Sequence, residues 1–299
     1  MVNNLEDVTT GLVDEVELLD SDDINKEGEW GQIVTCSTEI DQNTEKYAHV
    51  NSEAEYTRIV DGVVMPSGSM EFRVTDLEIF KLFGEEENDE IEIDKRQPKF
   101  TIKTSTEEGK HNEFSDAVFT GFSFNVARES PMTLSVDWMA QSVEPKTTSL
   151  SPESPDERFW TDLDVFVEID GSKVGIVDDF SIDMDREGAE HRRGISDKAE
   201  TNRRGVDYIK LGLIDLTLDM SIEITDDTAW DECDFEEDTR SDKDITLKFG
   251  EEDKEIEVTG RFSVVSDEKA DDADERIADL TGEIKENITV KLDTSTSTE

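Results

Sequence analysis

Basic residues are scarce in this sequence. Its 299 residues contain 30 Lys and Arg against 78 Asp and Glu, which gives a formal net charge of −48. A surface this acidic excludes binding of nucleic acid through neutralised phosphates. It also disfavours attachment to an anionic membrane. We therefore expect no function that depends on a positively charged surface.

Long apolar runs and cysteines are also lacking. No apolar run approaches the roughly 20 residues that a membrane-spanning helix needs. The first residues, MVNNLEDVTTGLVDEVELLD, lack the basic and apolar regions of a signal peptide. The sequence thus predicts a protein that is made in the cytoplasm and does not enter a membrane. Its two cysteines, Cys36 and Cys233, form no disulfide framework and are expected to be reduced and partly buried.

The acidity does not make the chain disordered. Leu, Ile, Val and Phe make up about a quarter of the residues, above the roughly 20% typical of disordered chains. A folded protein with so much negative charge repels itself unless salt screens it, and the Debye length falls to about 3 Å at 1 M salt. The composition therefore predicts a protein of an extreme halophile. An acidic ligand-binding or mineral-binding protein is the alternative.

Period-2 alternation is the strongest structural signal. From Ile214 to Ile224 the even positions are apolar and the odd positions polar, which predicts about 36 Å of half-buried strand. A change of phase beside Gly212 indicates a bulge or bend. Residues 122–126 and 132–138 predict one hairpin, residues 165–169 and 174–177 predict a second, and residues 180–184 predict a further strand.

Helix signals are few. Thr75 and Glu78 form a capping box, Leu77, Phe80 and Phe83 follow at helical spacing, and a helix of two or three turns is expected. Residues 12–19 show a weak helical pattern. The pattern of residues 272–284 fits a helix or a strand equally well.

Two similar halves are expected. The strand Met70–Val74 with its following turn and helix is repeated 150 residues later at Met220–Ile224, and Thr-Gly pairs at residues 120–121 and 259–260 each open a later strand. We predict a mainly β protein with a barrel or sandwich core, in two similar β-domains that each carry one short α-helix, plus long loops. The predicted divisions are an acidic N-terminal arm (1–28), a first β-domain (29–140), a linker (141–158), a second β-domain (159–292) and a flexible tail (293–299).

Catalytic motifs are absent from the sequence. His49, His111 and His191 do not belong to a metal-binding spacing, and no GxSxG, GxGxxG, P-loop or CxxC motif occurs. Acidic clusters at residues 20–23 and 271–274 lack the glycine and distal glutamate of a calcium-binding loop, so a solvated surface is favoured. No catalytic residue, metal ligand or cofactor is predicted.

One segment departs from the acidic composition. Residues 186–204 hold six Lys or Arg against four acids and read as a long loop between two strands. An exposed loop without a role and a nucleic-acid loop are alternatives. We favour an arm that docks on an acidic neighbouring subunit, because arginine binds carboxylates bidentately. The predicted subunit contacts are Arg186, Arg192, Arg193, Lys198, Arg203 and Arg204.

The chain resembles the major tail tube proteins of long-tailed viruses. The resemblance covers residues 60–292 and is carried by the strand and helix at 68–84, the hairpin FTGFSFNVARESPMTLSVDW, the segment IDGSKVGIVDDFSIDMDREG and the strand GVDYIKLGLIDLTLDMSIEI. The heavy acidic substitution departs from the family and fits a siphovirus-like virus of a halophilic archaeon.

The resemblance implies a structural virion protein of the tail. Such a protein is assembled in the host cytoplasm into stacked rings around a channel through which viral DNA passes without specific binding. Its implied partners are further copies of itself, a tape-measure protein, and tail-terminator or baseplate proteins. With two tube-like domains per chain, three chains in a pseudo-six-fold ring are preferred over six chains.

A negative, polar channel wall suits passage of DNA. The odd-numbered face of the long strand, together with polar positions of three other strands, would supply it. An ordinary solvent-facing surface is the alternative for these residues. The predicted channel-facing residues are Asp215, Thr217, Asp219, Ser221, Glu223, Ser69, Glu71, Ser123, Asn125, Ser135 and Asp137. Another virion β-protein, such as a capsid decoration or adhesion module, is the alternative function, and a β-sandwich enzyme is a weaker one.

Overall fold

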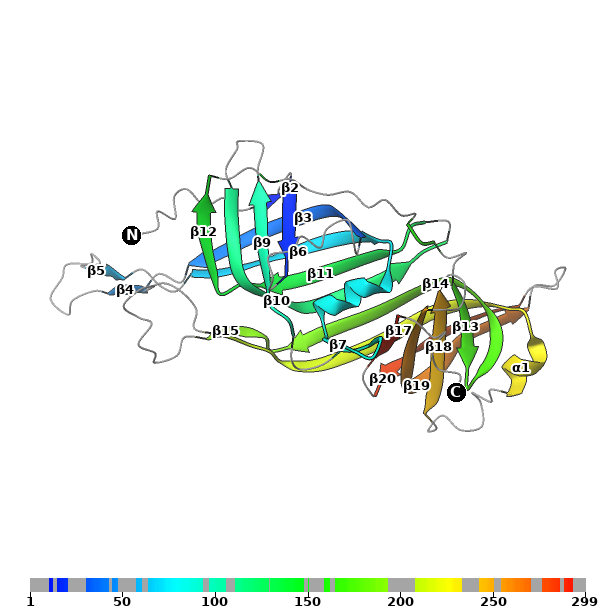
Figure 1. The fold of residues 1–299 in the computed structure, drawn as a ribbon. Helices are drawn as coiled ribbons and strands as arrows, with labels where there is room; N and C mark the ends of the chain where they lie inside the picture. Colours follow the sequence, from blue (N-terminus) through cyan, green and yellow to red (C-terminus); the bar gives the residue numbers. More distant parts are fainter. Residues whose placement is uncertain are drawn as a thin grey trace.

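The computed structural model consists almost entirely of antiparallel strands (Figure 1). Seventeen strands belong to one connected hydrogen-bonded network, and two further strand pairs stand apart from it. This confirms the predicted mainly β fold. The structure describes residues 11–12, 15–20, 31–42, 45–47, 58–60, 64–93, 97–105, 111–128, 130–147, 150, 159–161, 165–192, 208–232, 242–249, 254–269, 276–285 and 288–292.

The described residues of the first half of the chain form twelve strands and a 3₁₀-helix. They are β1 (Gly11–Leu12), β2 (Glu15–Leu19), β3 (Gly31–Gln42), β4 (Glu45–Tyr47), β5 (Arg58–Val60), β6 (Val64–Val74), η2 (Leu77–Leu82), β7 (Glu86–Glu87), β8 (Glu90–Glu92), β9 (Phe100–Ser105), β10 (His111–Val126), β11 (Thr133–Met139) and β12 (Ser142–Lys146).

The second half contains nine strands and one short α-helix. They are β13 (Val165–Ile169), β14 (Ser172–Glu187), β15 (Glu190–Arg192), β16 (Tyr208–Lys210), β17 (Leu213–Ile224), α1 (Asp227–Glu232), β18 (Lys243–Phe249), β19 (Lys254–Lys269), β20 (Arg276–Ile284) and β21 (Thr289–Lys291).

The two halves share one pattern of strand pairing. In the first half β2 pairs with β9, β3 with β6, β6 with β11, and β10 with β9, β11 and β12. In the second half β13 pairs with β18, β14 with β17, β17 with β20, and β19 with β18, β20 and β21. The repeated order of elements expected from the sequence is therefore present in the hydrogen bonding. The division into two separate domains stays a prediction.

The repeat differs from the expected one in the position of the Thr-Gly pairs. Neither pair opens a strand, because Gly121 and Gly260 both lie inside strands of 16 residues. Followed through the pairing, Gly121 lies opposite Asp137 and corresponds to Ser263, which lies opposite Thr281. The matching dipeptides are thus three residues out of structural register.

An eight-stranded sheet runs through both halves. Its order is β3–β6–β11–β10–β14–β17–β20–β19, four strands from each half, and the pairing of β10 with β14 joins the halves. Strands β2, β9, β12 and the first part of β10 form a second layer over the first half. In the second half β13 pairs with both β14 and β18, so six strands close into a barrel.

One apolar core lies between these layers. The even-numbered residues of β17 from Leu216 to Ile224 are at most 6% exposed, as the alternation predicts. Helix η2 fills the interior of the first half, where Phe80 lies edge-on to Phe122 and Phe124 at 5.7 and 5.2 Å between ring centroids. Packing of this kind adds to the area buried by each ring.

The predicted helix is present, but its cap is different. The N-cap is Asp76, whose side chain accepts a hydrogen bond from the Glu78 backbone N–H at 2.9 Å, so the predicted capping by Thr75 is wrong. The element is a 3₁₀-helix rather than an α-helix. At the matching position of the second half, Asp226 accepts from the Thr228 N–H at 3.0 Å ahead of α1.

The strands also bear on five other expectations. The predicted hairpins are β10–β11 and β13–β14, and the predicted strand at 180–184 is a continuation of β14. The helical interpretation of residues 12–19 is wrong, because β2 pairs with β9 and buries Val16, Leu18 and Leu19. The ambiguous segment contains strand β20. The first part of the expected linker 141–158 is a strand, because Ser142–Lys146 form β12, and residues 151–158 lie outside the described residues.

Candidate functional site

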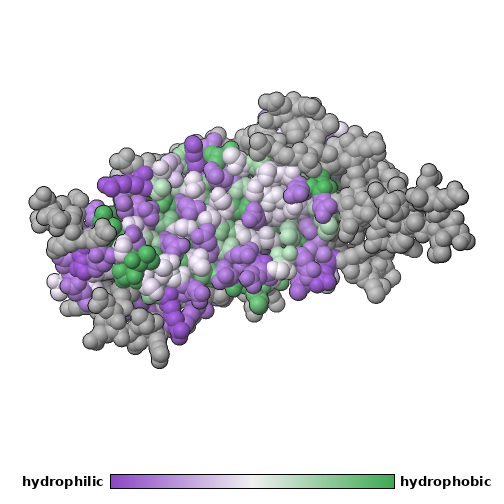
Figure 2. Space-filling view, turned by 180° about the vertical axis from the view of Figure 1, so that it is seen from behind, coloured by the Kyte–Doolittle hydropathy of each residue, from purple (hydrophilic) through white to green (hydrophobic). Residues whose placement is uncertain are grey.

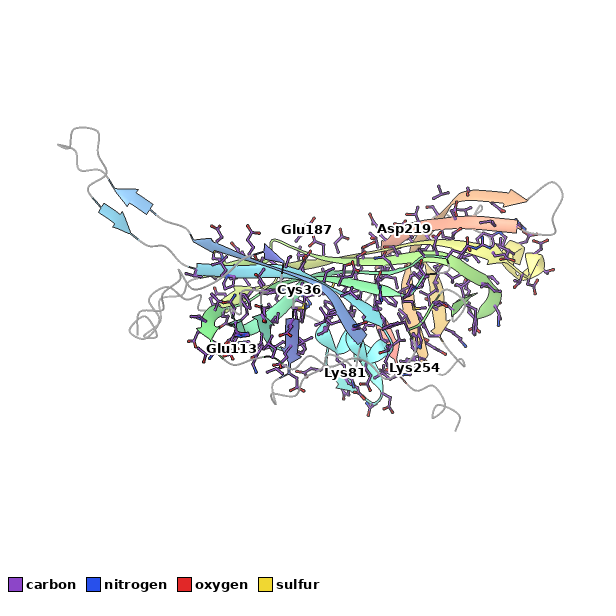
Figure 3. The ribbon with its side chains drawn as sticks, turned by 90° about the horizontal axis from the view of Figure 1, so that it is seen from above. Cys36, Lys81, Glu113, Glu187, Asp219 and Lys254 are labelled. Carbon is purple, nitrogen blue, oxygen red and sulfur yellow. The ribbon has the colours of Figure 1, made fainter. Side chains whose placement is uncertain are left out.

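The candidate site is the outer face of the eight-stranded sheet. Figure 2 shows this face, on which hydrophilic and weakly polar residues predominate across the middle. In the view from above, Asp219 and Glu187 lie on this side of the sheet, whereas Lys81, Glu113 and Lys254 lie on the opposite side (Figure 3). We call this surface the acidic face.

All eleven predicted channel-facing residues lie on the acidic face. The strand register places them in rows that cross the sheet. One row is Ser37, Ser69, Asp137, Gly121, Asp185 and Asp215. The next row is Thr35, Glu71, Ser135, Ser123, Asp183, Thr217 and Glu283. The structure therefore brings together residues that are up to 154 positions apart, between Ser69 and Glu223.

Sequence reasoning missed the central strand of this face. Strand β14 contributes Asp179, Ser181, Asp183 and Asp185, which pair across to β10 and β17. The signal was available, because Phe180, Ile182 and Met184 alternate with these residues and mark the opposite face. Strand β20 adds Asp279, Thr281 and Glu283 at one side.

Basic side chains are absent from the middle of the acidic face. The four segments that form it, residues 121–126, 133–139, 179–185 and 213–224, contain no Lys or Arg. Arg73 on β6 and Arg261 on β19 stand toward the two sides of the sheet. The centre of the face therefore carries acidic and uncharged side chains and no basic one.

Short hydroxyl side chains hold the acids in place. Ser181 donates to Asp183 at 2.5 Å, and Thr281 donates to Asp219. Asn125 donates its side-chain N–H to the Ser123 hydroxyl at 2.8 Å. These bonds run within the surface, so the acidic face is lined by short, mutually bonded groups rather than by long side chains.

A shallow hollow of about 360 Å³ lies near the middle of the acidic face. Gly121 is one of its lining residues, and a Cβ there would lie 3.1 Å from the Met184 carbonyl oxygen, 3.8 Å from an Asp137 oxygen and 4.0 Å from an Asp185 oxygen. Burial raises the pKa of the Asp137 carboxyl, and the nearby charge of Asp185 raises it further. No group of His, Cys, Asp or Glu in the described part of the chain is arranged to hold a metal ion.

Carboxylates also lie close to one another at one end of the acidic face. Burial raises the pKa of the Asp179 carboxyl, and the charges of Asp178 and Asp279 add to the effect. In a cation-binding site several carboxylates point toward one ion, whose charge offsets the repulsion between them. Here the acids are spread along strands, which suits repulsion of an anion over a large area.

The predicted basic loop begins as a strand and a hairpin. Arg186 is only 2% exposed within β14, so it lies inside the fold and not on the loop. Arg192 is exposed on β15 and forms an ion pair with Glu190, and Lys210 on β16 lies 3.6 Å from the same carboxylate. Arg193, Lys198, Arg203 and Arg204 lie outside the described residues.

His191 attaches the base of this loop to the first half. Its Nε2 lies 3.1 Å from the Pro66 carbonyl oxygen and 3.0 Å from the Ala140 carbonyl oxygen. Burial lowers the pKa of the imidazole, so the ring is neutral near neutral pH and its Nε2–H can donate to these acceptors. Strand β15 is therefore attached to the first half beside Pro66 of β6 and Ala140, which follows β11.

Comparison with known families agrees with this geometry. Residues 49–290 match the family model described as phage tail tube protein. A search of curated proteins finds no match. In the part of the chain that the structure describes, no helix is both long and apolar enough to cross a membrane.

Proposed function

The chain belongs to the phage tail tube protein family, and from this premise we propose that its copies form stacked rings around a negatively lined channel for the viral genome. The family is one of structural tail proteins, and the virion tail is the corresponding location. The ring, the channel and the passage of DNA are the proposal.

The acidic face is the observation that carries the proposal. A conduit has to let DNA slide, and phosphates bind surfaces that offer Lys or Arg. The centre of this face offers carboxylates, hydroxyls and other uncharged groups, and no Lys or Arg, over four adjacent strands. Repulsion between this face and the phosphates keeps the duplex from adhering to the wall.

The size of the sheet favours three chains in a ring. Three copies of an eight-stranded sheet would give roughly 24 strands, a circumference of about 115 Å and a diameter of about 37 Å at 4.8 Å per strand. Six copies would double that diameter. Since porins of 16–18 strands already enclose an aqueous channel, three copies suffice for a duplex, and the repeated half supplies the pseudo-six-fold symmetry.

The basic loop is proposed to join stacked rings. Arg192 begins it on the surface, and the four basic residues outside the described part of the chain follow. An arm of this charge would dock on an acidic neighbouring ring. Tape-measure, terminator and baseplate proteins remain proposed partners, and the acidic composition supports a halophilic archaeal host.

Electron microscopy of the purified protein in about 2–3 M salt, where the Debye length is below 3 Å, is the direct test. Hollow tubes with a regular repeat are expected, with three chains per ring in end-on views. Solid filaments or closed particles that never form a channel, even when an assembly initiator from the tail is added, would contradict the proposal.

Charge reversal on the acidic face tests the channel assignment. Replacing Asp215, Asp219 and Glu223 with Lys should leave tubes intact and slow or trap DNA during ejection, because phosphates would then adhere to the wall. The matched control makes the same charge change at Glu85, Glu87 and Glu92, which are exposed elsewhere. Equal ejection by wild type and both variants would show that the face does not line the channel.

Charge reversal in the loop tests ring stacking. Replacing Arg192, Arg193, Arg203 and Arg204 with Glu should prevent stacking and leave a folded protomer. Tubes of normal length from this variant would rule out the docking role of the loop.

A further inference from the structure

The two halves of the chain are joined by more than the pairing of β10 with β14. That pairing covers six residue pairs, from Gly121–Asp185 to Val126–Phe180. The rotation between adjacent strands varies among sheets from about 10° to about 35°. One strand pair alone would therefore leave the angle between the halves poorly defined.

The first additional contact is a strand of the first half that pairs with the second half. Strand β8 pairs with β21, with Ile91 opposite Val290, and both side chains are fully buried. Next to these strands the Leu292 N–H donates to the Asp89 carbonyl oxygen at 2.9 Å. The β7–β8 hairpin of the first half is thus hydrogen-bonded to the second half.

Trp160 makes the second contact. Its N–H donates to the Val74 carbonyl oxygen at 3.2 Å, and its carbonyl oxygen accepts from the Met132 N–H at 2.7 Å, so its backbone is bound to the first half. Its indole is stacked on Phe249 of β18, with 5.5 Å between the ring centroids. The residue therefore bonds to one half through its backbone and packs on the other half through its side chain.

An ion pair is the third contact. Asp76 uses Oδ1 to accept from the Glu78 N–H at the start of η2, and Oδ2 accepts from the Lys254 ammonium of β19. Lys254 Nζ also lies 5.7 Å from the centre of the Trp160 ring. The side chains of Asp76 and Lys254 are only 19% and 22% exposed, so salt screens their attraction less than that of a surface pair.

The ion pair lies on the side of the sheet opposite the acidic face. Figure 3 shows Lys254 on this side together with Lys81 of η2, whereas Asp219 is on the other side. We call Asp76, Lys254, Trp160 and the β8–β21 pair the clasp. The halves are thus held at two separate places, and they cannot turn about the β10–β14 pairing without breaking contacts of the clasp.

The helix of the second half is held in a different way. Asp226 caps α1 as Asp76 caps η2, but Asp231 of α1 lies 2.9 Å from Arg276 of the same half. Asp76 instead reaches across to Lys254 of the other half. The lysine contact is therefore a feature of the internal junction and not of the helix cap.

We infer that the clasp fixes the angle between the two halves and, through it, the number of chains that close a ring. This inference rests on the proposed ring. Each chain must turn the channel wall by about 120° in a ring of three and by about 90° in a ring of four. The spread of about 25° among single strand pairs is close to that difference. Without the clasp, rings of more than one size would therefore form.

Neutral substitutions in the full-length chain test the clasp. The clasp variant combines Asp76→Asn, which keeps the cap because asparagine is an equally good N-cap, with Lys254→Met, which keeps an unbranched side chain. The matched control combines Asp242→Asn with Lys285→Met and removes a lysine–aspartate pair within the second half. Asp76→Asn alone repeats the test with a milder change if the double variant does not fold.

The distance between two spin labels measures the angle in the protomer. The labels are placed at Glu144→Cys on β12 and Glu283→Cys on β20, which are exposed and lie on different halves, with Cys233→Ser in every sample. Burial raises the pKa of the Cys36 thiol to about 12, so this natural cysteine reacts slowly and is kept. The distance distribution should be narrow in the parent protein and in the control, and clearly broader in the clasp variant.

Electron microscopy of the same proteins at high salt measures the effect on the ring. The parent protein and the control should form tubes of one diameter, and the clasp variant should shift to tubes or rings of several diameters. Tubes of one unchanged diameter from the clasp variant would overturn the role of the clasp in ring size, even with a broadened distance distribution.

The two measurements separate this inference from the proposed function. A distance distribution that is as narrow in the clasp variant as in the control would overturn the clasp, whatever tubes form. Absence of hollow rings from the parent protein would contradict the proposed function and the effect on ring size, while the distance distribution would still decide whether the clasp fixes the angle.

Discussion

The two halves of the molecule share a fold plan but end in different shapes. The second half closes into a barrel, because β13 pairs with both β14 and β18. In the first half β2 pairs with β9, and the described residues of β2 and β3 are not paired with each other. The same set of strands thus makes a closed body in one case and an open, two-layered body in the other.

The connection between two strands accounts for this difference. Strands β13 and β14 are joined by Asp170 and Gly171, whose φ angles of 49° and 79° are both in the left-handed region that a tight hairpin turn requires. Strands β2 and β3 are separated by residues 20–30 instead. A two-residue turn forces neighbouring strands to pair, whereas a longer connection leaves the pairing to tertiary contacts.

The halves also fill equivalent core positions in opposite ways. In the first half Trp138 on β11 lies opposite Gly68 on β6, and a side chain on Gly68 would meet the indole at 2.5 Å. In the second half the glycine is on β20, as Gly282, and the large residue, Leu218, is on β17. Each half therefore pairs one glycine with one large apolar residue at this place, but on opposite strands.

Removing these large residues should have the largest effect on the protomer. Trp138 is 1% exposed and lies edge-on to Phe114 at 5.0 Å, so Trp138→Ala should lower the free energy of unfolding by about 3–5 kcal/mol. Leu218→Ala in the closed half should cost about 2–5 kcal/mol. Denaturant titration at fixed high salt measures both. A cost below 1 kcal/mol for Trp138→Ala would show that the open half is not packed around this residue.

Opening the tight turn is the next test. Gly171→Val forces a β-branched residue into a φ of 79° and should cost about 1–2 kcal/mol. Amide exchange should speed up in β13 and much less in β9, because only β13 depends on that turn. Gly171→Asn is the matched control at the same position, since asparagine tolerates the left-handed region. Equal change in β9 and β13 would mean that the turn does not decide closure.

A substitution on the acidic face should change the free energy of unfolding by less than the two tests above, by an amount that depends on pH. The pKa of Asp137 is raised by burial and by Asp185, so the folded state binds this proton more tightly than the unfolded state does. Stability from this group is therefore present below the ordinary pKa of 3.8 and is lost as pH rises through the raised value.

The Asp137→Asn variant does not lose stability in this way, because asparagine does not ionise. At pH 7 it should increase the free energy of unfolding by less than about 1 kcal/mol, since the group is partly exposed and salt screens it. The gain should shrink as the pH approaches 4. Unfolding at both pH values measures it, with Glu85→Gln as an exposed control. A destabilised variant at pH 7 would contradict the repulsion.

The smallest effect on the protomer is expected at the free edge of the sheet. Val265→Lys should change the free energy of unfolding by no more than about 0.5 kcal/mol, because the side chain is 67% exposed. It should nevertheless reduce ring formation, since a lysine on an edge strand opposes pairing with another chain. Ile176→Lys, at an exposed position of a strand with partners on both edges, is the control. Sedimentation in high salt compares the two.

Much of the fold could be predicted from local pattern. Alternation along residues 214–224 identified a strand and separated its buried residues from its acidic ones. The capping aspartates Asp76 and Asp226 were harder to assign, since Thr75 and Thr225 offer the same chemistry one residue earlier. The Thr-Gly match misled because a bulge at Thr120 shifts the register, and bulges leave no clear mark in a single sequence.

The sequence by itself determined which residues of each strand share a face, because side chains alternate with a period of two wherever a strand forms. That was enough to place all eleven predicted residues on one surface. Only the tertiary structure decided that β14 lies in the middle of that surface, that one half closes, and that, among the described residues, β19 beyond Gly260 pairs on one side only. Those features depend on pairing between segments far apart in the chain, which no local pattern encodes.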